Sequence, residues 1–383
     1  MMRASHGVLG LLALAACGDN APRARVAALT VADAMGGSPD DDAAFARATA
    51  PPTLSFPDDH GSHAPFRTEW WYVTANLDAA EGRRFGVQLV FFRQALAAQA
   101  AAREGSLAAR DLVFAHAAVT DVDGATFHHA ERMTRAADEL GFVVGGRGDA
   151  PFEVRCVDWS ARAADGASFL PLELRASDPG FAIELTVEDG KKLVLQGDRG
   201  LSQKSAAVGN ASIYYSMTRL PIRGALVVDG VRHEVSGLGW IDREWSTSAL
   251  GPDQVGWDWF SLQLDDETEV MWYRLRLRDG SSDPWSRGCF VAADGSSQRL
   301  LPANVTVTPI GEWTAPDGGA AYPERWRLRC AEPPFDLEVT PLLADQELHT
   351  LVRYWEGAVS VEGTRAGLPV QGRGYLEMTG YVR

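Results

Sequence analysis

The chain has 383 residues, of which 46% are apolar and 23% charged, a balance that is typical of globular proteins and excludes collagen, disordered and multi-span membrane classes. Asp and Glu outnumber Lys and Arg by 51 to 36, and the formal charge of −15 argues against nucleic acid as a partner, because such a surface repels phosphate. The 12 tryptophans favour cores or ligand cavities with largely apolar walls.

The first sixteen residues have the pattern of an export signal. A ten-residue apolar run over 7–16 is too short to span a bilayer but fits a secretory signal. It ends at Leu14-Ala15-Ala16-Cys17, which resembles a bacterial lipobox. We therefore expect a signal peptide over 1–16, acylation of Cys17 and a lipid anchor in the cell envelope. In similar lipoproteins an Asp after the cysteine favours the inner membrane, so Gly18 favours the outer membrane, facing the periplasm.

Residues 17–52 are rich in Ala, Asp, Pro and Gly, which is typical of a flexible tether. The following residues form short alternating runs rich in Val, Phe, Tyr and Trp, separated by Asp-Gly turns. Such runs predict strands and hairpins. Examples are Phe85–Arg93, Leu112–Asp121, Phe181–Val187 and Trp257–Leu264.

The expected fold is all-β, with two tandem antiparallel barrels. A single barrel cannot use more than about 300 residues without opening a channel, because its diameter grows with strand number. Residues 239–383 also repeat the general pattern of 53–238, which is a Trp-rich opening, a hairpin and then strands with Gly–Asp turns. We therefore place one domain in each range. In an exported protein Cys289 and Cys330 could pair, which would leave Cys156 as a buried free thiol.

Clusters of tryptophan and acidic residues recur along the body of the chain. They are Glu69-Trp70-Trp71-Tyr72, Trp240-Ile241-Asp242-Arg243-Glu244-Trp245, Trp257-Asp258-Trp259-Phe260 and Tyr354-Trp355-Glu356-Gly357, and the turn motif Gly197-Asp198-Arg199-Gly200 lies between the first two. In this order and spacing, the chain from about Phe56 to Tyr381 resembles the AttH-like, carotenoid 1,2-hydratase-like family.

The resemblance implies two lipocalin-like β-barrels packed together and a large apolar ligand. Relatives hydrate the terminal double bond of acyclic carotenoids, and fungal relatives guide intramolecular cycloadditions of polyenes. Many bacterial members are exported lipoproteins, some encoded beside lipoprotein-export-type transporters. The resemblance does not place the catalytic acids of the carotenoid hydratases on this sequence, so it supports the fold more strongly than a reaction.

Hydration of an alkene needs a proton donor, and a carboxylic acid is suitable where an apolar wall raises its pKa. Asp242, Glu244 and Asp258 lie among aromatic residues, and Glu69 lies beside two tryptophans. His116, in mid-strand, is a further candidate acid or base. We expect the site at the domain junction, because the acids come from both halves of the chain.

Each candidate also has a structural interpretation. Asp258 would share a strand face with Phe260 and could pair with Arg243 or backbone groups. Glu69 could close the barrel with an arginine that packs on tryptophan, Arg93 or Arg219 being the partner. Asp242 and Glu244 could pair with the adjacent arginine, and His116 could be a satisfied core histidine.

The candidate ligand-binding residues are the aromatic wall and two hydroxyl donors: Trp70, Trp71, Trp257, Trp259, Tyr215 and Tyr273. The sequence has no HExxH metal motif, no GxSxG nucleophile motif and no nucleotide-binding motif. We therefore expect neither a metal site nor a cofactor, and neither a serine nor a metallo hydrolase.

Two functions remain open. The first is a membrane-tethered carrier or chaperone for a hydrophobic small molecule, such as a terpenoid, polyene or lipid, which could serve an ABC-type transporter. The second is an acid–base hydratase, cyclase or isomerase acting on such a molecule. A buried unpaired carboxylate in an apolar pocket would favour the enzyme, whereas salt-bridged acids throughout would favour the carrier.

Overall fold

The computed structural model describes residues 44–96, 98, 110–136, 141–144, 150–248, 250–316 and 320–381. Within these ranges the chain is all-β, as expected, and every strand pairing is antiparallel. In the described part of the chain the strands are accompanied by one 3-10 turn, η1 (Asp58–His60). None of the described segments forms an apolar helix long enough to cross a bilayer. Cys17 lies outside the described residues.

The first sheet has thirteen strands in the order β4-β3-β2-β1-β13-β12-β9-β8-β7-β6-β5, with β10 and β11 also paired to β12. Its strands are β1 (Thr68–Ala79), β2 (Arg84–Ala95), β3 (Asp111–Asp121), β4 (Thr126–Arg135), β5 (Gly141–Val144), β6 (Glu153–Cys156), β7 (Trp159–Ala163), β8 (Leu172–Asp178), β9 (Phe181–Val187), β10 (Val194–Leu195), β11 (Leu201–Gln203), β12 (Ala211–Val228) and β13 (Val231–Ser246).

The second sheet has ten strands in the order β17-β16-β15-β14-β25-β24-β22-β21-β18, with β23 also paired to β24. Its strands are β14 (Gln254–Leu264), β15 (Glu269–Leu277), β16 (Arg287–Val291), β17 (Ser297–Leu300), β18 (Val305–Ile310), β21 (Arg325–Ala331), β22 (Pro334–Pro341), β23 (Glu347–His349), β24 (Arg353–Arg365) and β25 (Leu368–Met378). A separate hairpin pairs β19 (Trp313–Thr314) with β20 (Ala321–Tyr322).

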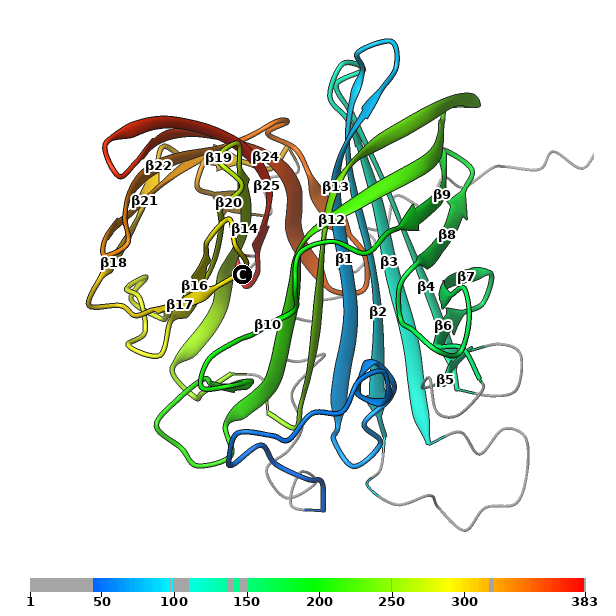
Figure 1. The fold of residues 1–383 in the computed structure, drawn as a ribbon, viewed down its shortest axis with the longest axis horizontal. Helices are drawn as coiled ribbons and strands as arrows, with labels where there is room; N and C mark the ends of the chain where they lie inside the picture. The colour runs from blue at the N-terminus through cyan, green and yellow to red at the C-terminus, as the bar shows by residue number, and fades with distance from the viewer. Residues whose placement is uncertain are drawn as a thin grey trace, which may run out of the picture.

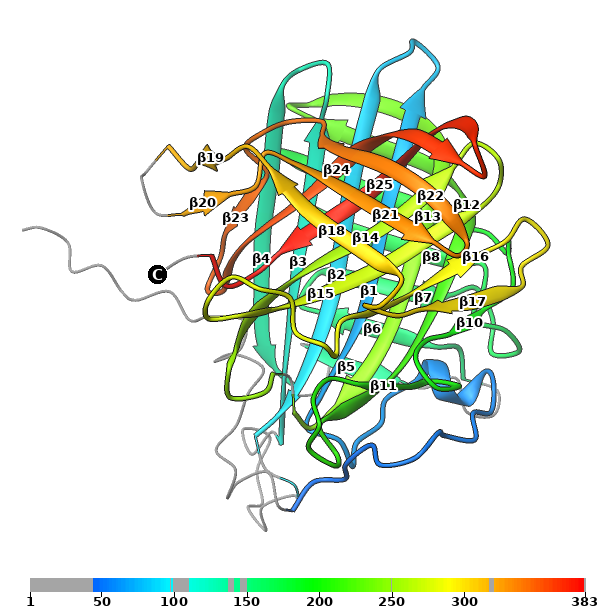
Figure 2. The same cartoon turned by 90° about the vertical axis from the view of Figure 1, so that its left-hand side faces the viewer.

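The two sheets curl into barrels that lie side by side (Figure 1), and Figure 2 shows the second barrel in front of the first. Strands on the outside of the molecule, such as β8, alternate between buried and exposed residues. By contrast, β1, β2 and β3 are buried on both faces. Their inner faces fill the first barrel and their outer faces pack against the second.

The described residues form three large apolar clusters and a small fourth one around Leu348 and Tyr354. One fills the first barrel around Leu77 and Leu89, and one fills the second around Phe260 and Trp326. The third lies between the barrels and combines residues of both sheets, such as Tyr72 and Trp259. The barrel interiors are therefore packed cores.

Three details differ from the expected organisation. The first sheet continues to Ser246, because β13 pairs with both β1 and β12, so the sheets divide after this residue and not at 238/239. Residues 44–52, expected within the tether, lie against the body, where Phe45 and Ala48 are buried. Cys289 and Cys330 do not pair, since all three cysteines of the described chain are free and buried.

Candidate functional site

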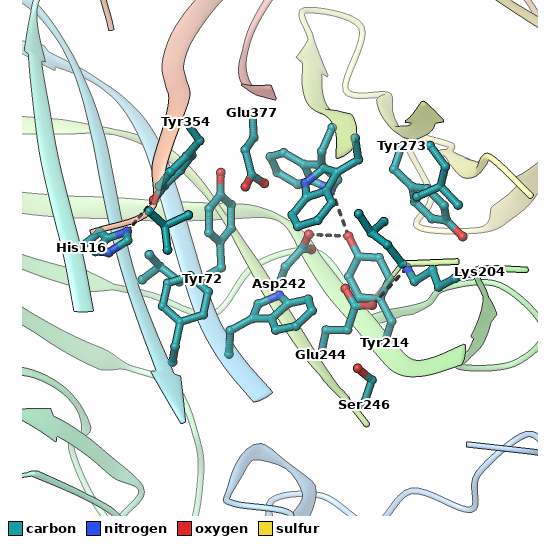
Figure 3. Close-up of a pocket in the computed structure, with 18 of the residues that line it drawn as sticks. Tyr72, His116, Lys204, Tyr214, Asp242, Glu244, Ser246, Tyr273, Tyr354 and Glu377 are labelled. Atoms are coloured by element: carbon teal, nitrogen blue, oxygen red, sulfur yellow. Dashed lines mark hydrogen bonds and ion pairs between the residues drawn. The ribbon is translucent and has the colours of Figure 1, made fainter. Parts of the chain in front are cut away.

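A pocket of about 110 Å³ lies between the two barrels, at the junction that we favoured (Figure 3). Nine aromatic residues line it: Trp70, Tyr72, Phe92, Phe114, Tyr214, Trp257, Trp259, Tyr273 and Tyr354. The polar residues that line it are His116, Lys204, Asp242, Glu244, Ser246, Ser248 and Glu377. An apolar cavity somewhat larger than this one holds a benzene molecule, so the pocket suits one ring or a short unsaturated segment of a ligand.

The alternation of strand residues decides which side chains reach the pocket. In β1, Trp70 and Tyr72 face it, while Trp71 packs in the core of the first barrel. In β14, Trp257 and Trp259 face it, while Phe260 belongs to the core of the second barrel. Each Trp-rich motif therefore supplies one face to a barrel core and the other to the pocket.

Asp242 is the most buried acid of the pocket, and it lacks a cationic partner among the described residues. Its Oδ1 accepts hydrogen bonds from Ser216 Oγ at 2.5 Å and Trp240 Nε1 at 2.7 Å. Its Oδ2 accepts a hydrogen bond from the Tyr214 hydroxyl, which also accepts one from Trp259 Nε1 at 3.1 Å. Burial raises the pKa of Asp242 to about 7, against the effect of these donors. The carboxyl group can therefore hold or release a proton near neutral pH.

Glu377, from β25, provides a second carboxyl group in the pocket (Figure 3). Burial raises the pKa of Glu377 to about 7, and the negative charges of Asp242 and Glu244 act in the same direction. No ion pair of the described residues involves Glu377. The pocket thus presents two acids that titrate near pH 7, one from each sheet.

Glu244 is instead paired. Its Oε1 lies 3.1 Å from Lys204 Nζ, which is also 4.1 Å from the centre of the Tyr273 ring. Although burial acts to lower it, the pKa of Lys204 is raised, chiefly by the charge of Glu244. This pair forms a charged end of the pocket and does not supply a free acid. The Tyr273 hydroxyl also contacts Ser202 Oγ at 3.0 Å.

His116 is held at both ring nitrogens. Its Nδ1 lies 2.8 Å from the Tyr354 hydroxyl, and its Nε2 lies 3.0 Å from Glu131 Oε1. Burial acts to raise the pKa of Glu131, but the hydrogen bond from His116 holds it below the ordinary value. His116 therefore lines the pocket as one member of a hydrogen-bonded chain.

The structure places Asp258 outside the pocket, inside the end of the second barrel. Its Oδ2 lies 2.9 Å from Arg274 Nη1, and its Oδ1 accepts a hydrogen bond from the Tyr381 hydroxyl at 2.9 Å. Asp258 does share a face with Phe260, as expected, but this face points away from the ligand space. Its partners are Arg274 and Arg276, not Arg243.

Glu69, Trp71 and Tyr215 also lie outside the pocket, at the base of the first barrel. Glu69 is fully buried and forms ion pairs with Arg93 and Arg243. The Arg243 guanidinium packs on the Trp71 ring, so barrel closure is the role that the geometry supports, with Arg243 as the stacking residue. The Tyr215 hydroxyl is held by His60 Nδ1 at 2.6 Å.

Sequence reasoning missed Tyr72, Tyr214, Lys204 and Glu377. Tyr214 and Tyr215 are adjacent and point to opposite faces of β12, and the face that meets the second barrel could not be identified from one strand. Glu377 had a usable signal, since it interrupts the apolar run Leu376–Met378. The described residues contain no group of three His, Cys, Asp or Glu side chains arranged to hold a metal ion.

The family model described as AttH-like matches residues 47–381. The chain belongs to the AttH-like family. Among solved structures, an AttH-like protein of Nitrosomonas europaea is 32% identical, with a TM-score of 0.76, and the match covers 88% of this chain and 100% of that one. These findings confirm the resemblance seen in the Trp/acid clusters.

Two further AttH-like architectures share the fold at lower identity. Kievitone hydratase from Nectria haematococca is 16% identical with a TM-score of 0.65, over 88% of this chain and 96% of that one. CghA, in complex with Sch210972, is 14% identical with a TM-score of 0.52, over 89% and 97%. No curated protein sequence matches the chain.

Proposed function

We propose that this AttH-like protein is an acid–base enzyme of the hydratase or cyclase type, which acts on an apolar, unsaturated small molecule in the pocket between the barrels. The observation that carries the proposal is Asp242, a buried carboxyl group that has no cationic partner among the described residues and lies beside a tyrosine hydroxyl and an aromatic wall. A carboxyl group in this environment meets the requirement for a general acid near neutral pH. That one structural neighbour is a hydratase supports this class.

The chemistry begins with protonation of a carbon–carbon double bond. When Asp242 is protonated on Oδ2, its hydrogen bond with Tyr214 reverses, so Asp242 donates to the Tyr214 oxygen while the Tyr214 hydroxyl gives its proton to the substrate carbon. The π electrons form the new C–H bond and leave a cation on the neighbouring carbon. Trp259 and Tyr72 line the pocket, where an aromatic face can stabilise positive charge. Water or a second double bond of the ligand then captures the cation, which gives a hydrated or a cyclised product.

Deuterium uptake tests this function. The mature protein is incubated in D2O with farnesol, squalene and kievitone, and mass spectrometry follows the gain of one deuterium on carbon. We expect uptake with at least one probe, and Asp242→Asn to reduce its rate roughly 100- to 10,000-fold. Asp253→Asn, which changes an exposed carboxylate, is the matched control. Equal rates in Asp242→Asn and the control would reject Asp242 as the acid.

A carrier of the same ligand class is the second candidate, supported by the largely aromatic lining of the pocket. A carrier does not need an unpaired carboxyl group in that lining, which makes Asp242 and Glu377 favour the enzyme. Solvent extraction of purified protein followed by mass spectrometry separates the two. A retained phospholipid mixture, together with no deuterium uptake by any probe, would support the carrier and an ABC-type transporter as its partner.

The proposed location is the bacterial cell envelope, with the body held at the outer membrane by acylated Cys17. A Cys17→Ser variant should leave the membrane fraction and appear in the soluble periplasmic fraction. A variant that still sediments with membranes would contradict the anchor without affecting the proposed reaction.

A further inference from the structure

Beyond Tyr72, four polar side chains meet where the two sheets touch: Asn76, Gln88, Glu356 and Tyr375. All four are more than nine-tenths buried. Gly86 fixes their relative positions. A Cβ added to Gly86 would lie 2.5 Å from the Ala358 Cβ and 3.1 Å from the Tyr375 hydroxyl oxygen.

Strand register brings Asn76, Gln88 and Glu356 to the contact between Gly86 and Ala358. Asn76 is paired with Gly86 across β1 and β2, and its Nδ2 donates to the Gly374 carbonyl of the other sheet at 3.1 Å. Gln88 follows Gly86 by two residues and Glu356 precedes Ala358 by two, so both point into the contact between the sheets. The four side chains therefore form one polar cluster, which we call the inter-sheet cluster.

Five atoms of the inter-sheet cluster lack a well-formed hydrogen bond to the described protein atoms, although Tyr354 lies beside Gln88 and Thr120 lies beside Tyr375. The five atoms are Asn76 Oδ1, Gln88 Oε1, Gln88 Nε2, Glu356 Oε2 and the Tyr375 hydroxyl. Buried polar groups in proteins are almost always hydrogen-bonded, and ordered water serves groups that protein atoms do not reach. The five atoms include donors and acceptors, which is the combination that a buried water molecule bridges.

Glu356 connects the inter-sheet cluster to the pocket. Its Oε1 accepts a hydrogen bond at 2.5 Å from the hydroxyl of Tyr72, which lines the pocket. Glu356 is also the register partner of Glu377, which lines the pocket too. Burial and the nearby charge of Glu377 raise the pKa of Glu356 well above its ordinary value. A carboxyl group whose neutral form is favoured by burial therefore lies between the pocket and the unpartnered atoms.

We propose that the inter-sheet cluster holds ordered water and that Tyr72 and Glu356 carry a proton from the pocket to this water. The inference rests on the proposed function. In a hydration, the attacking water forms the C–O bond and loses one proton to the Tyr72 oxygen. Tyr72 passes its own proton to Glu356 Oε1, and Glu356 releases the proton on Oε2 to the water of the cluster. Glu356 is therefore neutral both before and after the step. The proton released to the water of the cluster equals in number the proton that Asp242 gave to the substrate carbon.

Kinetics with the deuterium-accepting probe test the proton path. We expect Glu356→Gln and Tyr72→Phe to lower kcat roughly 100-fold and to leave KM within about twofold, because general-base assistance acts on the chemical step. Tyr322→Phe is the matched control. It removes another buried tyrosine–glutamate hydrogen bond, Tyr322 to Glu347 at 2.6 Å, from the core of the second barrel. A similar fall of kcat in the control would overturn the path, as would an unchanged kcat in Glu356→Gln.

A crystal structure of the mature protein at high resolution tests the water site without turnover. We expect density for water within hydrogen-bond distance of Glu356 Oε2 and Gln88. Direct pairing of these side chains with each other, or a dry contact, would overturn the site. Loss of uptake in Asp242→Asn with full activity in Glu356→Gln would reject the proton path and keep the proposed function. If the wild type converts no probe, the proposed function and the path fail together, and the density alone decides the water site.

Discussion

The guanidinium carbon of Arg243 lies 3.9 Å from the centre of the Trp71 ring. The same guanidinium forms an ion pair with Glu69, which is also paired with Arg93. The buried Arg243 side chain is thus held at the base of the first barrel by an ion pair, by hydrogen bonds and by a cation–π contact. Although burial acts to raise it, the charge of Arg243 and its neighbours hold the pKa of Glu69 well below the ordinary range.

Removing the charge of Glu69 should destabilise the protein strongly. Glu69→Gln leaves the buried guanidinium of Arg243 without its anion and leaves Arg93 with Asp111 alone, and breaking a buried pair costs about 3–5 kcal/mol. Denaturant unfolding measures the change. Glu338→Gln breaks an exposed pair with Arg325 and should cost less than about 1 kcal/mol. Equal losses in the two variants would contradict a closing role for Glu69.

The protonation of Asp242 should make stability fall as the pH rises. Its pKa is about 7 in the folded protein against an ordinary value of 3.8, so the native state binds the proton more tightly than the unfolded chain. This contribution is complete below pH 3.8 and is lost as the pH rises through about 7. Relative to the wild type, Asp242→Asn should therefore gain up to about 1.4 kcal/mol per pH unit across this window. Unfolding curves from pH 4 to 8 test this, and a difference that does not vary with pH would refute it.

His60 should have the opposite effect. Burial, and then the charge of Arg243, lower the pKa of His60 from 6.5 to about 3, so the unfolded chain binds the proton more tightly than the native state. The contribution of His60 is present above pH 6.5 and is lost as the pH falls toward 3. His60→Asn should therefore lose less stability between pH 7 and pH 4 than the wild type does. Denaturant unfolding at both pH values measures the change, and a pH dependence identical to that of the wild type would contradict the prediction.

The contact between Gly86 and Ala358 should limit how closely the sheets approach. An added Cβ at Gly86 would lie only 2.5 Å from the Ala358 Cβ, so Gly86→Ala should cost about 1–3 kcal/mol through overpacking. Adding Ala358→Gly to Gly86→Ala removes the clash and should restore more than half of that loss. Additive effects in the double variant, measured by chemical denaturation, would show that the two residues do not interact.

Much of the fold could be predicted from the sequence, because strand alternation is a local property. The run Phe181–Val187 is the strand β9, and Asp258 and Phe260 share a face as expected. The site was harder to predict, because the relevant face of a strand depends on which sheet packs against it. Tyr215 was expected to face the ligand, but its neighbour Tyr214 does so. The packing of the second sheet decides which of the two tyrosines faces the pocket, and nothing in the sequence around either residue indicates it.

The position of the pocket has a consequence for how the gene product can be divided. Asp242 comes from one half of the chain and Glu377 from the other, so neither half alone carries a complete set of acids. Two fragments expressed from a cut between Ser246 and Gln254 would each keep their own sheet but would regain function only by reassociating. The proposed activity, measured in such a split protein, would then report directly on the affinity of the two barrels for each other.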